Sequence, residues 1–432
     1  MAAAVAAALA EQVAPGARLA IALSGGIDSM LLLDALTRFA AHPLALSAIH
    51  VHHGLSPNAD RWAEFCSEQC AARNVPLVTH RLLLSRERGA SLEALARAAR
   101  YERLLATDVD VIALAHHADD QAETLLLQLL RGAGPHGLAA MPAFRPGRPA
   151  LLRPLLELSR GTLAACAAER GLAWIEDESN ADRRHARNFI RLDVAPALAA
   201  RFAGYPGTLA RAARHQAEAA ALADELAALD ADGALDPAGL SRFRLAALSS
   251  ARARNLLRWF LREKGLRPPS EASLAEMLRQ LVAGDEDARI RIVQDGAEIG
   301  THRGRVVIHA PAAAAFERVW HGEAEVVLPG GVLAFERARG AGVAEAKLGH
   351  SRVTLRSRGG GERIRLAANR PTHAVKKLLQ EARLPPWERQ GLPLIWSGDE
   401  LAAVPGIGVA LAFQAAPDEP GWHVEWRPRR PA

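Results

Sequence analysis

Short apolar runs alternate with helical patterns along the first part of the chain. The apolar runs are Leu19–Leu23, Leu44–Val51, Leu77–Leu84 and Val109–Ala115. Amphipathic stretches lie between and after them and predict helices at Asp28–Phe39, Asp60–Arg73, Ser91–Ala106 and Asp119–Leu130. Strands that are apolar on both faces and separated by helices predict a parallel sheet covered on both sides. Right-handed crossovers then give a doubly wound α/β sheet, which binds ligands at the carboxyl ends of its strands.

The pattern changes twice after this sheet, so we predict three domains. Residues 1–201 form the sheet domain with an extension. Residues 202–339 form a small helical domain with short strands, and residues 351–432 form a mixed α+β domain. Gly340–His350 is the predicted linker before the last domain.

Local signals place some elements in these later domains. Asn255–Glu263 has helical periodicity, and a further helix is predicted near Ala374–Ala382. Asp295-Gly296 is a strong hairpin signal, and Gly330-Gly331 predicts a second hairpin.

Polar residues follow three of the four predicted strands of the first domain. They are Ser24 after the first strand, His50, His52 and His53 at the end of the second, and His116, His117, Asp119 and Asp120 after the fourth. Because parallel strands end at one edge of the sheet, these side chains are expected to gather at one site.

Composition narrows the class of protein. Half of the 432 residues are apolar and the formal net charge is +5, which fits a globular protein and is compatible with nucleic-acid binding without establishing it. No apolar run is long enough to span a membrane, and the alanine-rich start lacks the basic region of a signal peptide. We therefore expect a short N-terminal helix, no membrane partner and a cytoplasmic location.

The three cysteines do not form a disulfide framework. Cys66 and Cys70 share a helical face, where apolar packing is favoured over a metal or redox pair. The histidines at the strand ends could suggest zinc, but no cysteine or helical histidine pair completes a tetrahedral set. Hydrogen bonding to a nucleotide or base is the preferred interpretation of these histidines.

The segment Ser24-Gly25-Gly26-Ile27-Asp28-Ser29 lies between a predicted strand and a predicted helix. The glycines allow a close approach of the backbone to an anion, and the helix N-terminus supplies free N–H groups. Asp28 would repel phosphate unless Mg²⁺ bridged the two, so it is the candidate metal ligand. The alternative is an ordinary glycine turn with side-chain helix capping.

This loop lacks the lysine of a Walker A motif and the spacing of a dinucleotide fingerprint. It resembles the pyrophosphatase (PP) loop of the N-type ATP pyrophosphatases, which cleave ATP between the α- and β-phosphates and adenylylate a substrate. Amidotransferases and RNA thiolases of that superfamily generally need reactive or paired cysteines. The cysteines here lie in no such motif, which favours a nitrogen nucleophile supplied from outside.

Further motifs resemble the tRNA(Ile)-lysidine synthetase family over nearly the whole chain, in the family's order. They are His50-Val-His-His-Gly-Leu, Glu93-Ala-Leu-Ala-Arg97 with Arg100-Tyr101, His116-His-Ala-Asp119-Asp120-Gln-Ala-Glu123, Arg131-Gly-Ala-Gly-Pro-His-Gly137, Asp177-Glu-Ser-Asn180, Arg187-Asn-Phe-Ile-Arg191, Gly360-Gly-Glu-Arg363 and Lys376-Lys377 to Trp387. One departure is His52, where many members carry Asn.

The resemblance implies a reaction. ATP would adenylylate the C2 oxygen of the wobble cytidine in a tRNA(Ile) with a CAU anticodon, and diphosphate would leave. The amine of L-lysine would then attack C2, expel AMP and form lysidine.

It also implies residue roles. The loop Ser24–Ser29, with His50 and His53, would bind ATP, and Asp28, Arg97 and Asp120 would be catalytic. Asp120, Glu123 and Arg187 would bind lysine, with one of the carboxylates helping to deprotonate its amine. The residues expected to bind tRNA are Arg191, Arg363, Lys376, Lys377 and Arg383.

Structural alternatives to these roles stay open. Asp119 and Asp120 could only cap their helix, and Arg97 could pair with Glu93 one turn away. Arg187 and Arg191 could form a solvated basic face, as could the C-terminal basic cluster. The functional alternatives are another PP-loop enzyme, such as a thiolase or amidotransferase, and a non-catalytic ATP-gated RNA-binding protein. The sequence leaves open whether the chain is a monomer or a homodimer.

Overall fold

The computed structural model describes residues 1–39, 44–54, 56–82, 92–283, 290–311, 314–349 and 351–428. The chain divides into two compact units, Met1–Ala223 and Asp224–Ala432. The boundary falls inside one long helix, α10 (Tyr205–Ala231). The three-domain division proposed from the sequence stays a prediction. Among the described residues, no helix is both long and apolar enough to cross a membrane.

Unit 1 is built on a six-stranded sheet with the strand order β3-β2-β1-β4-β6-β5. Its strands are β1 (Arg18–Ala22), β2 (Ala45–His52), β3 (Leu77–Arg81), β4 (Val111–Ala113), β5 (Phe144–Arg145) and β6 (Ala150–Leu152). All neighbouring strands run parallel except β5, which is antiparallel to β6 at the edge. The predicted doubly wound parallel sheet is confirmed.

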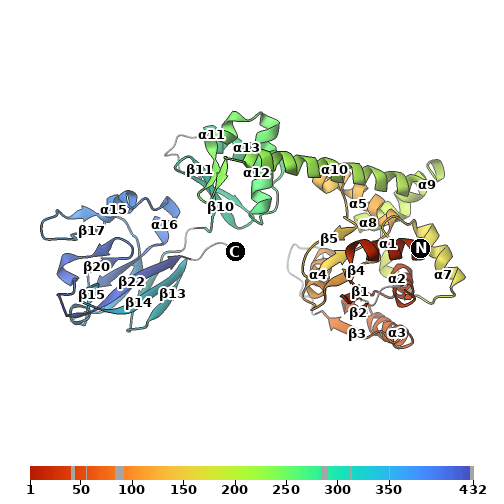
Figure 1. Cartoon of the computed structure of the whole chain (residues 1–432), viewed down its shortest axis with the longest axis horizontal. Coiled ribbons are helices and arrows are strands. Elements are labelled where there is room, and N and C mark those ends of the chain that lie inside the picture. The colour runs from red at the N-terminus through yellow and green to blue at the C-terminus, as the bar shows by residue number, and fades with distance from the viewer. Residues whose placement is uncertain are drawn as a thin grey trace. The chain divides into compact units, whose positions relative to one another are not determined.

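Helices cover both faces of this sheet (Figure 1). They are α1 (Ala2–Gln12), α2 (Ile27–Thr37), α3 (Ala59–Ala71), α4 (Leu92–Leu105), α5 (Ala118–Leu130), α6 (Pro135–Leu138), α7 (Arg160–Glu169), α8 (Ala186–Phe189) and α9 (Ala195–Arg201). A 3₁₀ turn, η1, spans Glu178–Ala181, and a π-helical turn, η2 (Ile190–Val194), lies between α8 and α9. Alternate side chains of β1 serve the two faces: Ile21 packs with α1, α2 and α7, whereas Ala20 packs on the side of α4.

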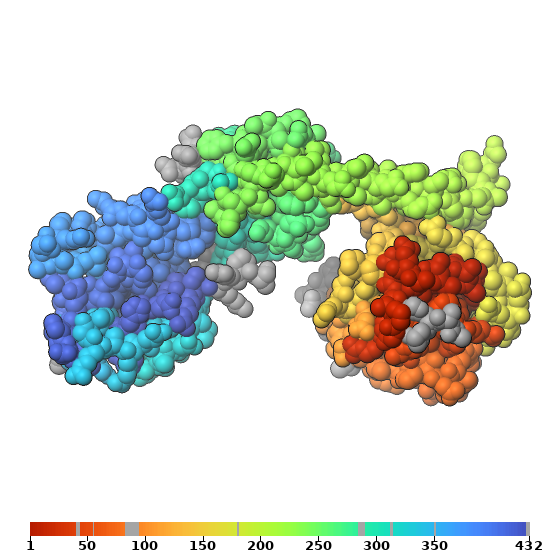
Figure 2. Space-filling model, in the orientation of Figure 1, coloured from red at the N-terminus to blue at the C-terminus, as the bar shows by residue number. Residues whose placement is uncertain are grey.

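The start of the chain is part of this core. Val5 and Leu9 of α1 are buried in the same cluster as Ile21, and Figure 2 shows this first segment, in red, packed against the rest of unit 1. Cys66 and Cys70 of α3 are also buried there. The predicted N-terminal helix and the apolar role of these two cysteines are thus confirmed.

One sequence expectation for this sheet was wrong, and two of its strands were missed. Strand β3 was expected to be buried on both faces, yet it is an edge strand whose Val78 is 48% exposed. Part of its predicted span, residues 83–84, lies outside the described residues. Strands β5 and β6 were not predicted, because runs of two and three residues carry no readable periodicity.

Unit 2 contains two groups of elements with separate apolar clusters. The first group follows α10 and consists of β7 (Leu235–Asp236), β8 (Gly239–Ser241), α11 (Arg242–Ala247), α12 (Ser250–Glu263), α13 (Glu271–Ala283), β9 (Ile292–Gln294), β10 (Ala297–His302) and β11 (Arg305–His309). The turn between β9 and β10 is Asp295-Gly296, with positive φ at both residues, so the predicted hairpin is confirmed.

The second group carries the remaining strands and short helices. They are β12 (Glu317–Val319), β13 (Glu325–Leu328), β14 (Gly331–Arg339), β15 (Val343–Ala344), α14 (Glu345–Leu348), β16 (Val353–Ser357), β17 (Arg363–Ile364), β18 (His373–Ala374), α15 (Val375–Glu381), α16 (Pro386–Gly391), β19 (Pro393–Ser397), β20 (Glu400–Val404), β21 (Gly408–Val409), η3 (Leu411–Phe413) and β22 (Pro420–Pro428). The second hairpin, β13–β14, and the helix α15 are confirmed.

The predicted linker at Gly340–His350 was wrong for the residues described there. Strand β15 pairs with β22, and Val343 and Leu348 are buried. Gly342 has a φ of +81°, and a Cβ at this position would meet the carbonyl oxygen of Trp422 at 2.2 Å. Its glycine therefore allows a close strand approach rather than flexibility.

Candidate active site

The loop Ser24–Ser29 connects the carboxyl end of β1 to the N-terminus of α2. Gly25 has a φ of +87°, and its carbonyl accepts a hydrogen bond from the backbone N–H of Ile175 (2.9 Å). The Ser29 hydroxyl lies inside the turn, where it accepts from the N–H of Gly25 (3.1 Å) and donates to the carbonyl of Gly26 (2.9 Å). Ser29 thus fixes the turn in front of the helix N-terminus, the part of a helix whose free N–H groups bind phosphate.

A cavity of about 410 Å³ opens beside this loop. One part of its lining is apolar. It comes from the strands and the residues after them, namely Ala22, Leu23, Ile49, Val51, Leu114 and Ala115, and from Leu104 of α4. The other part is polar and consists of Ser24, Gly26, Asp28, Ser29, His53, Arg97, Arg100, His116, Asp120, His185, Arg187, Asn188 and Arg191. An apolar slot next to a phosphate-binding loop suits the base and the phosphates of a nucleotide.

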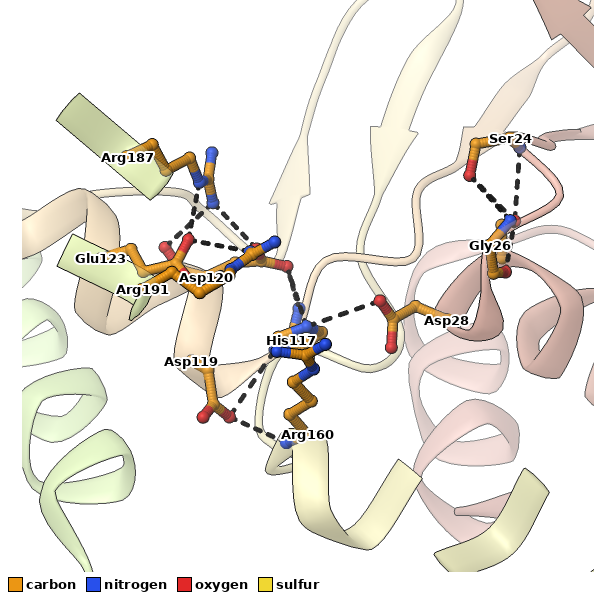
Figure 3. A network of polar contacts seen from close by, with 11 residues as sticks. Ser24, Gly26, Asp28, His117, Asp119, Asp120, Glu123, Arg160, Arg187 and Arg191 are labelled. Carbon is orange, nitrogen blue, oxygen red and sulfur yellow. Dashed lines mark hydrogen bonds and ion pairs between the residues drawn. The ribbon is translucent and has the colours of Figure 1, made fainter. Parts of the chain in front are cut away.

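Two acids of α5 and two arginines form a compact network at one side of the cavity (Figure 3). Arg187 donates from Nε to Glu123 (2.7 Å) and from Nη2 to Asp120 (2.9 Å). Arg191 repeats the pattern, with Nε 2.7 Å from Glu123 and Nη2 3.2 Å from Asp120. The Glu123 side chain is only 5% exposed. Burying an unpaired carboxylate is unfavourable, and charge-assisted hydrogen bonds of this kind offset that cost.

This network adds ion pairs that the sequence did not predict and decides one open alternative. Asp120 and Glu123 each pair with both arginines. Arg187 and Arg191 do not form a solvated face. Burial opposes ionisation of Asp120, but His117 and Arg187 outweigh it and keep the pKa of Asp120 below its ordinary value.

His117 lies between the loop and the network, as Figure 3 shows. Its Nε2 is 3.6 Å from Asp28 and 3.5 Å from Asp120, and its Nδ1 is 3.7 Å from Asp119. Burial would lower the pKa of His117, but the bond to Asp28 and the neighbouring carboxylates raise it overall. The imidazolium form is thereby favoured, and it connects Asp28 to the acids of α5.

The capping alternative is confirmed for Asp120, whereas Asp119 caps a different helix, α7. Asp120 accepts a hydrogen bond from the backbone N–H of His117 (3.1 Å) at the start of α5. Asp119 accepts from the backbone N–H of Arg160 (2.8 Å), at the start of α7. Asp120 therefore serves both as a cap and as a member of the network.

The predicted nucleotide-binding histidines lie at different depths. His53 lines the cavity, and burial, followed by the nearby Arg100, lowers its pKa to about 4. His50 is 5% exposed and lies outside the cavity lining, with Nδ1 2.9 Å from the carbonyl oxygen of Leu23. Burial lowers the pKa of His50, so this neutral ring supports the end of β1 through its Nδ1–H. Within the described residues there is no group of three or more metal-ligating side chains.

Helix α4 contributes three further side chains to this region. The guanidinium groups of Arg97 and Arg100 lie 5.5 Å and 5.6 Å from the ring centroid of Tyr101. Both arginines line the cavity. The side chain of Glu93 lies outside the described residues, so the proposed Glu93–Arg97 pair stays a prediction.

Sequence reasoning assigned no role to Arg153, which is buried just behind the cavity. It follows β6, and its Nε donates to Nδ1 of His116 (3.3 Å). The rule that polar residues follow parallel strands would have identified it, had the three-residue strand been recognised.

The predicted RNA-binding residues belong to both units. Arg191 lies in unit 1, whereas Arg363, Lys376, Lys377 and Arg383 are exposed on unit 2. Arg363 donates to the carbonyl of Thr372 (3.1 Å), and Lys377 lies 3.8 Å from Glu381. These contacts leave the four side chains accessible, so the basic surface stays a candidate for phosphate binding.

Comparison with known families agrees with this fold and site. Residues 1–198 match the family model described as PP-loop domain. Residues 240–307 match the TilS substrate binding domain, and residues 353–426 match the TilS substrate C-terminal domain. The sheet and its loop therefore define a protein of the PP-loop ATP pyrophosphatase class.

Whole-length relatives narrow the class to one family. A tRNA(Ile)-lysidine synthase from Nitrosomonas europaea is 44% identical over 428 residues, covering 96% of this chain and 93% of that protein. The synthase of Aromatoleum aromaticum is 43% identical, covering 97% of this chain and 99% of that protein. That of an Azoarcus species is 42% identical, with coverage of 96% and 93%. This chain belongs to the tRNA(Ile)-lysidine synthase family, as its motifs predicted.

Proposed function

We propose that this chain converts the wobble cytidine of a tRNA(Ile) with a CAU anticodon to lysidine, using ATP and L-lysine. The observation that carries the proposal is the cavity itself, in which a phosphate-binding loop lies beside a buried cluster of carboxylates. The base oxygen attacks the α-phosphorus of ATP and diphosphate leaves. The amine of lysine then attacks C2 of the adenylylated base, loses a proton and expels AMP.

The loop suits the nucleotide half of this reaction. Ser24 and Gly26 line the cavity and would hold phosphate oxygens, while Ser29, which also lines it, would fix the turn that Gly25 and Ile27 complete. Asp28 lines it too, and its Oδ1 is buried without a hydrogen-bond partner. Such an oxygen fits a Mg²⁺ ligand, the remaining ligands being phosphate and water oxygens. Bound there, Mg²⁺ would supply charge neutralisation for the diphosphate leaving group.

The charged groups of the network suit the second step of this reaction, in which lysine attacks. Four carboxylates, those of Asp28, Asp119, Asp120 and Glu123, gather around His117, Arg187 and Arg191. A lysine ammonium would find ion-pair partners among these carboxylates. Asp120 lines the cavity and, unlike Asp28, is not assigned to the metal, so it would receive the proton from the amine. Glu123 would act behind it, and Arg187 would orient the carboxylate group of lysine.

Arg97 would stabilise the charge that develops in the reaction, and the exposed basic residues would bind the tRNA. Arg97 lines the cavity from α4, where a fixed guanidinium would stabilise charge at the α-phosphate. Arg191 would contact the anticodon near the cavity, and Arg363, Lys376, Lys377 and Arg383 would contact phosphates elsewhere on the tRNA. We place the reaction in the cytoplasm. Light scattering of the protein with and without tRNA decides between a monomer and a homodimer.

The alternative chemistries are not favoured. Within the part of the chain that the structure describes, no cysteine lines the cavity. Cys66 and Cys70 are buried in the core, and burial raises the pKa of Cys66 to about 12, which suppresses the thiolate that sulfur transfer needs.

The decisive experiment is mass spectrometry of the anticodon nucleotides after incubation of the tRNA with ATP, lysine and the protein. We expect the mass of one lysine less one water at the wobble cytidine, together with AMP and diphosphate. Asp28→Ala should abolish diphosphate release while the protein stays folded. Equal turnover of a transcript whose wobble base is not cytidine, or sulfur in the product, would contradict the proposal.

A further inference from the structure

Adjacent histidines at the end of β4 have different environments. His117 is surrounded by carboxylates, whereas the half-buried His116 lines the cavity and faces Arg153. Arg153 is 6% exposed, and its Nε donates a hydrogen bond to Nδ1 of His116 at 3.3 Å.

The Arg153 guanidinium is held in place by the β5–β6 hairpin. Its backbone N–H donates to the carbonyl of Ala143 (2.8 Å), and its Nη1 donates to the carbonyl of Pro142 (2.7 Å). Tyr101, the ring that packs against Arg97 and Arg100, also interacts electrostatically with Arg153. Because both ends of the side chain are tied, Nε has one fixed direction.

A guanidinium has only donors and keeps its proton throughout the physiological range. A histidine nitrogen that accepts from it must therefore carry no hydrogen, and the neutral ring then carries its hydrogen on Nε2. We propose that Arg153 is a positioning residue that fixes His116 as the neutral Nε2–H tautomer, so that this ring offers the cavity a hydrogen-bond donor.

The groups around His116 favour the same state. Burial, the first cause, lowers the pKa of His116 to about 3. Asp120 on α5 opposes this shift, whereas Arg153 after β6, Arg187 on α8 and Arg100 on α4 disfavour a second proton. The ring consequently stays neutral throughout the range in which a free histidine titrates, about pH 5 to 8.

The consequence for the reaction rests on the proposed function. A fixed N–H suits an oxygen that gains negative charge, such as one on the α-phosphate. With Nδ1 engaged by Arg153, His116 does not take the proton of the attacking amine. That proton is left to a carboxylate.

The tautomer is measured directly by NMR of the full chain labelled with ¹⁵N-histidine, with His116→Gln identifying the signal. We expect Nε2–H without titration between about pH 5.5 and 8, and Arg153→Met should give mixed tautomers that titrate nearer the ordinary value of about 6.5. Arg145→Met removes an exposed arginine of the same hairpin and should leave the signal unchanged. A hydrogen on Nδ1 in the wild type, or an unchanged signal in Arg153→Met, overturns the proposal. These spectra need neither ATP nor tRNA, so they are independent of the proposed function.

Activity gives a second test, read as AMP release. His116→Gln keeps an N–H near the position of Nε2 and should retain most activity, whereas His116→Ala should lose about 10²-fold. Arg153→Met should cost about tenfold, the scale for a group that orients another. In the His116→Gln background, which has no tautomers, the same change should cost much less. An equal loss in both backgrounds means that Arg153 is merely structural and refutes its role through His116.

Discussion

Glu123→Gln tests whether the acid–arginine network stabilises unit 1 as its geometry requires. The Glu123 carboxylate accepts the Nε–H of both Arg187 and Arg191 at 2.7 Å, and a second bond from Arg191 at 3.0 Å. Glutamine keeps the size of the side chain and one oxygen. It loses the charge and turns an amide NH₂ toward a guanidinium, donor against donor.

The expected cost follows from burial. Removing one partner of a buried ion pair costs about 3–5 kcal/mol, because the other charge is left without compensation. Here both arginines keep Asp120 as a partner, and their side chains are 22% and 24% exposed, so water reaches them. We therefore expect the lower end of that range, about 3 kcal/mol. Glu157→Gln is the matched control, since its partner Arg214 is 52% exposed and the loss should stay within about 0.5 kcal/mol.

The cysteines provide an assay specific to this unit. All three lie in unit 1, and Cys66 and Cys70 are buried in its core. Pulse labelling of these two thiols along a urea titration reports the unfolding of unit 1 independently of unit 2. The free energy of unfolding is then compared between the wild type, Glu123→Gln and the control.

If Glu123→Gln lowers the free energy of unfolding no more than Glu157→Gln does, the acids and arginines do not form a buried, mutually dependent network. A double-mutant cycle with Arg191→Gln sharpens the test. The two changes should couple by about 1–3 kcal/mol, the usual range for directly contacting residues of one network. A coupling near zero would mean that this carboxylate and this guanidinium do not interact in solution.

Three further predictions use simpler readouts. Gly25→Ala should weaken ATP binding and lower stability by about 1–2 kcal/mol, because its φ is +87° and its Cβ would lie 2.6 Å from a neighbouring side chain. Gly26→Ala is the control and should fold like the wild type, because the nearest neighbour of its Cβ is at 3.6 Å. Equal thermal shifts for the two variants would contradict this difference between the two glycines. Burial would raise the pKa of Asp34, but its bonds to Arg170 and Arg38 lower it overall. The stabilisation that ionised Asp34 provides is therefore full above about pH 4 and is lost as pH falls through its folded pKa. The difference in free energy of unfolding between the wild type and Asp34→Asn should shrink only in acid. A difference that instead declines toward alkaline pH would be inconsistent with these ion pairs. In the native protein Cys166, which is partly exposed, should react with a thiol reagent well before Cys66 and Cys70, and fast labelling of all three would show that the core opens.

The loop and the main strands could be predicted because their signals are local. Gly25-Gly26 after a buried run and before an amphipathic helix determines a strand–loop–helix unit within a few residues. The partners of Glu123 could not be predicted in this way. Arg187 and Arg191 lie more than 60 residues further along the chain, and their spacing alone is equally consistent with a solvated helix face. Only the packing of α8 against α5, together with the contact of Arg191 on η2 with Glu123, distinguishes the two.

The short elements were missed for a different reason. Strand β6 is three residues long, and its place in the sheet is set by pairing with β4, not by its own pattern. Arg153 follows that strand and was missed with it. The glycines at 340 and 342 suggested a linker because composition does not distinguish a flexible glycine from one that allows close strand packing.

The order of the network along the chain has a consequence for synthesis. The central strand β1 and its loop leave the ribosome first, Asp120 and Glu123 follow on α5, and Arg187 and Arg191 emerge last. Until those arginines are available, docking α5 would bury Glu123 without its two cations and leave Asp120 with His117 alone, at a cost of several kcal/mol. We therefore expect α5 to stay undocked until about 60 further residues have been synthesised. A chain on a ribosome stalled before Arg187 would have its nucleotide loop but could not form the acid–arginine network beside it.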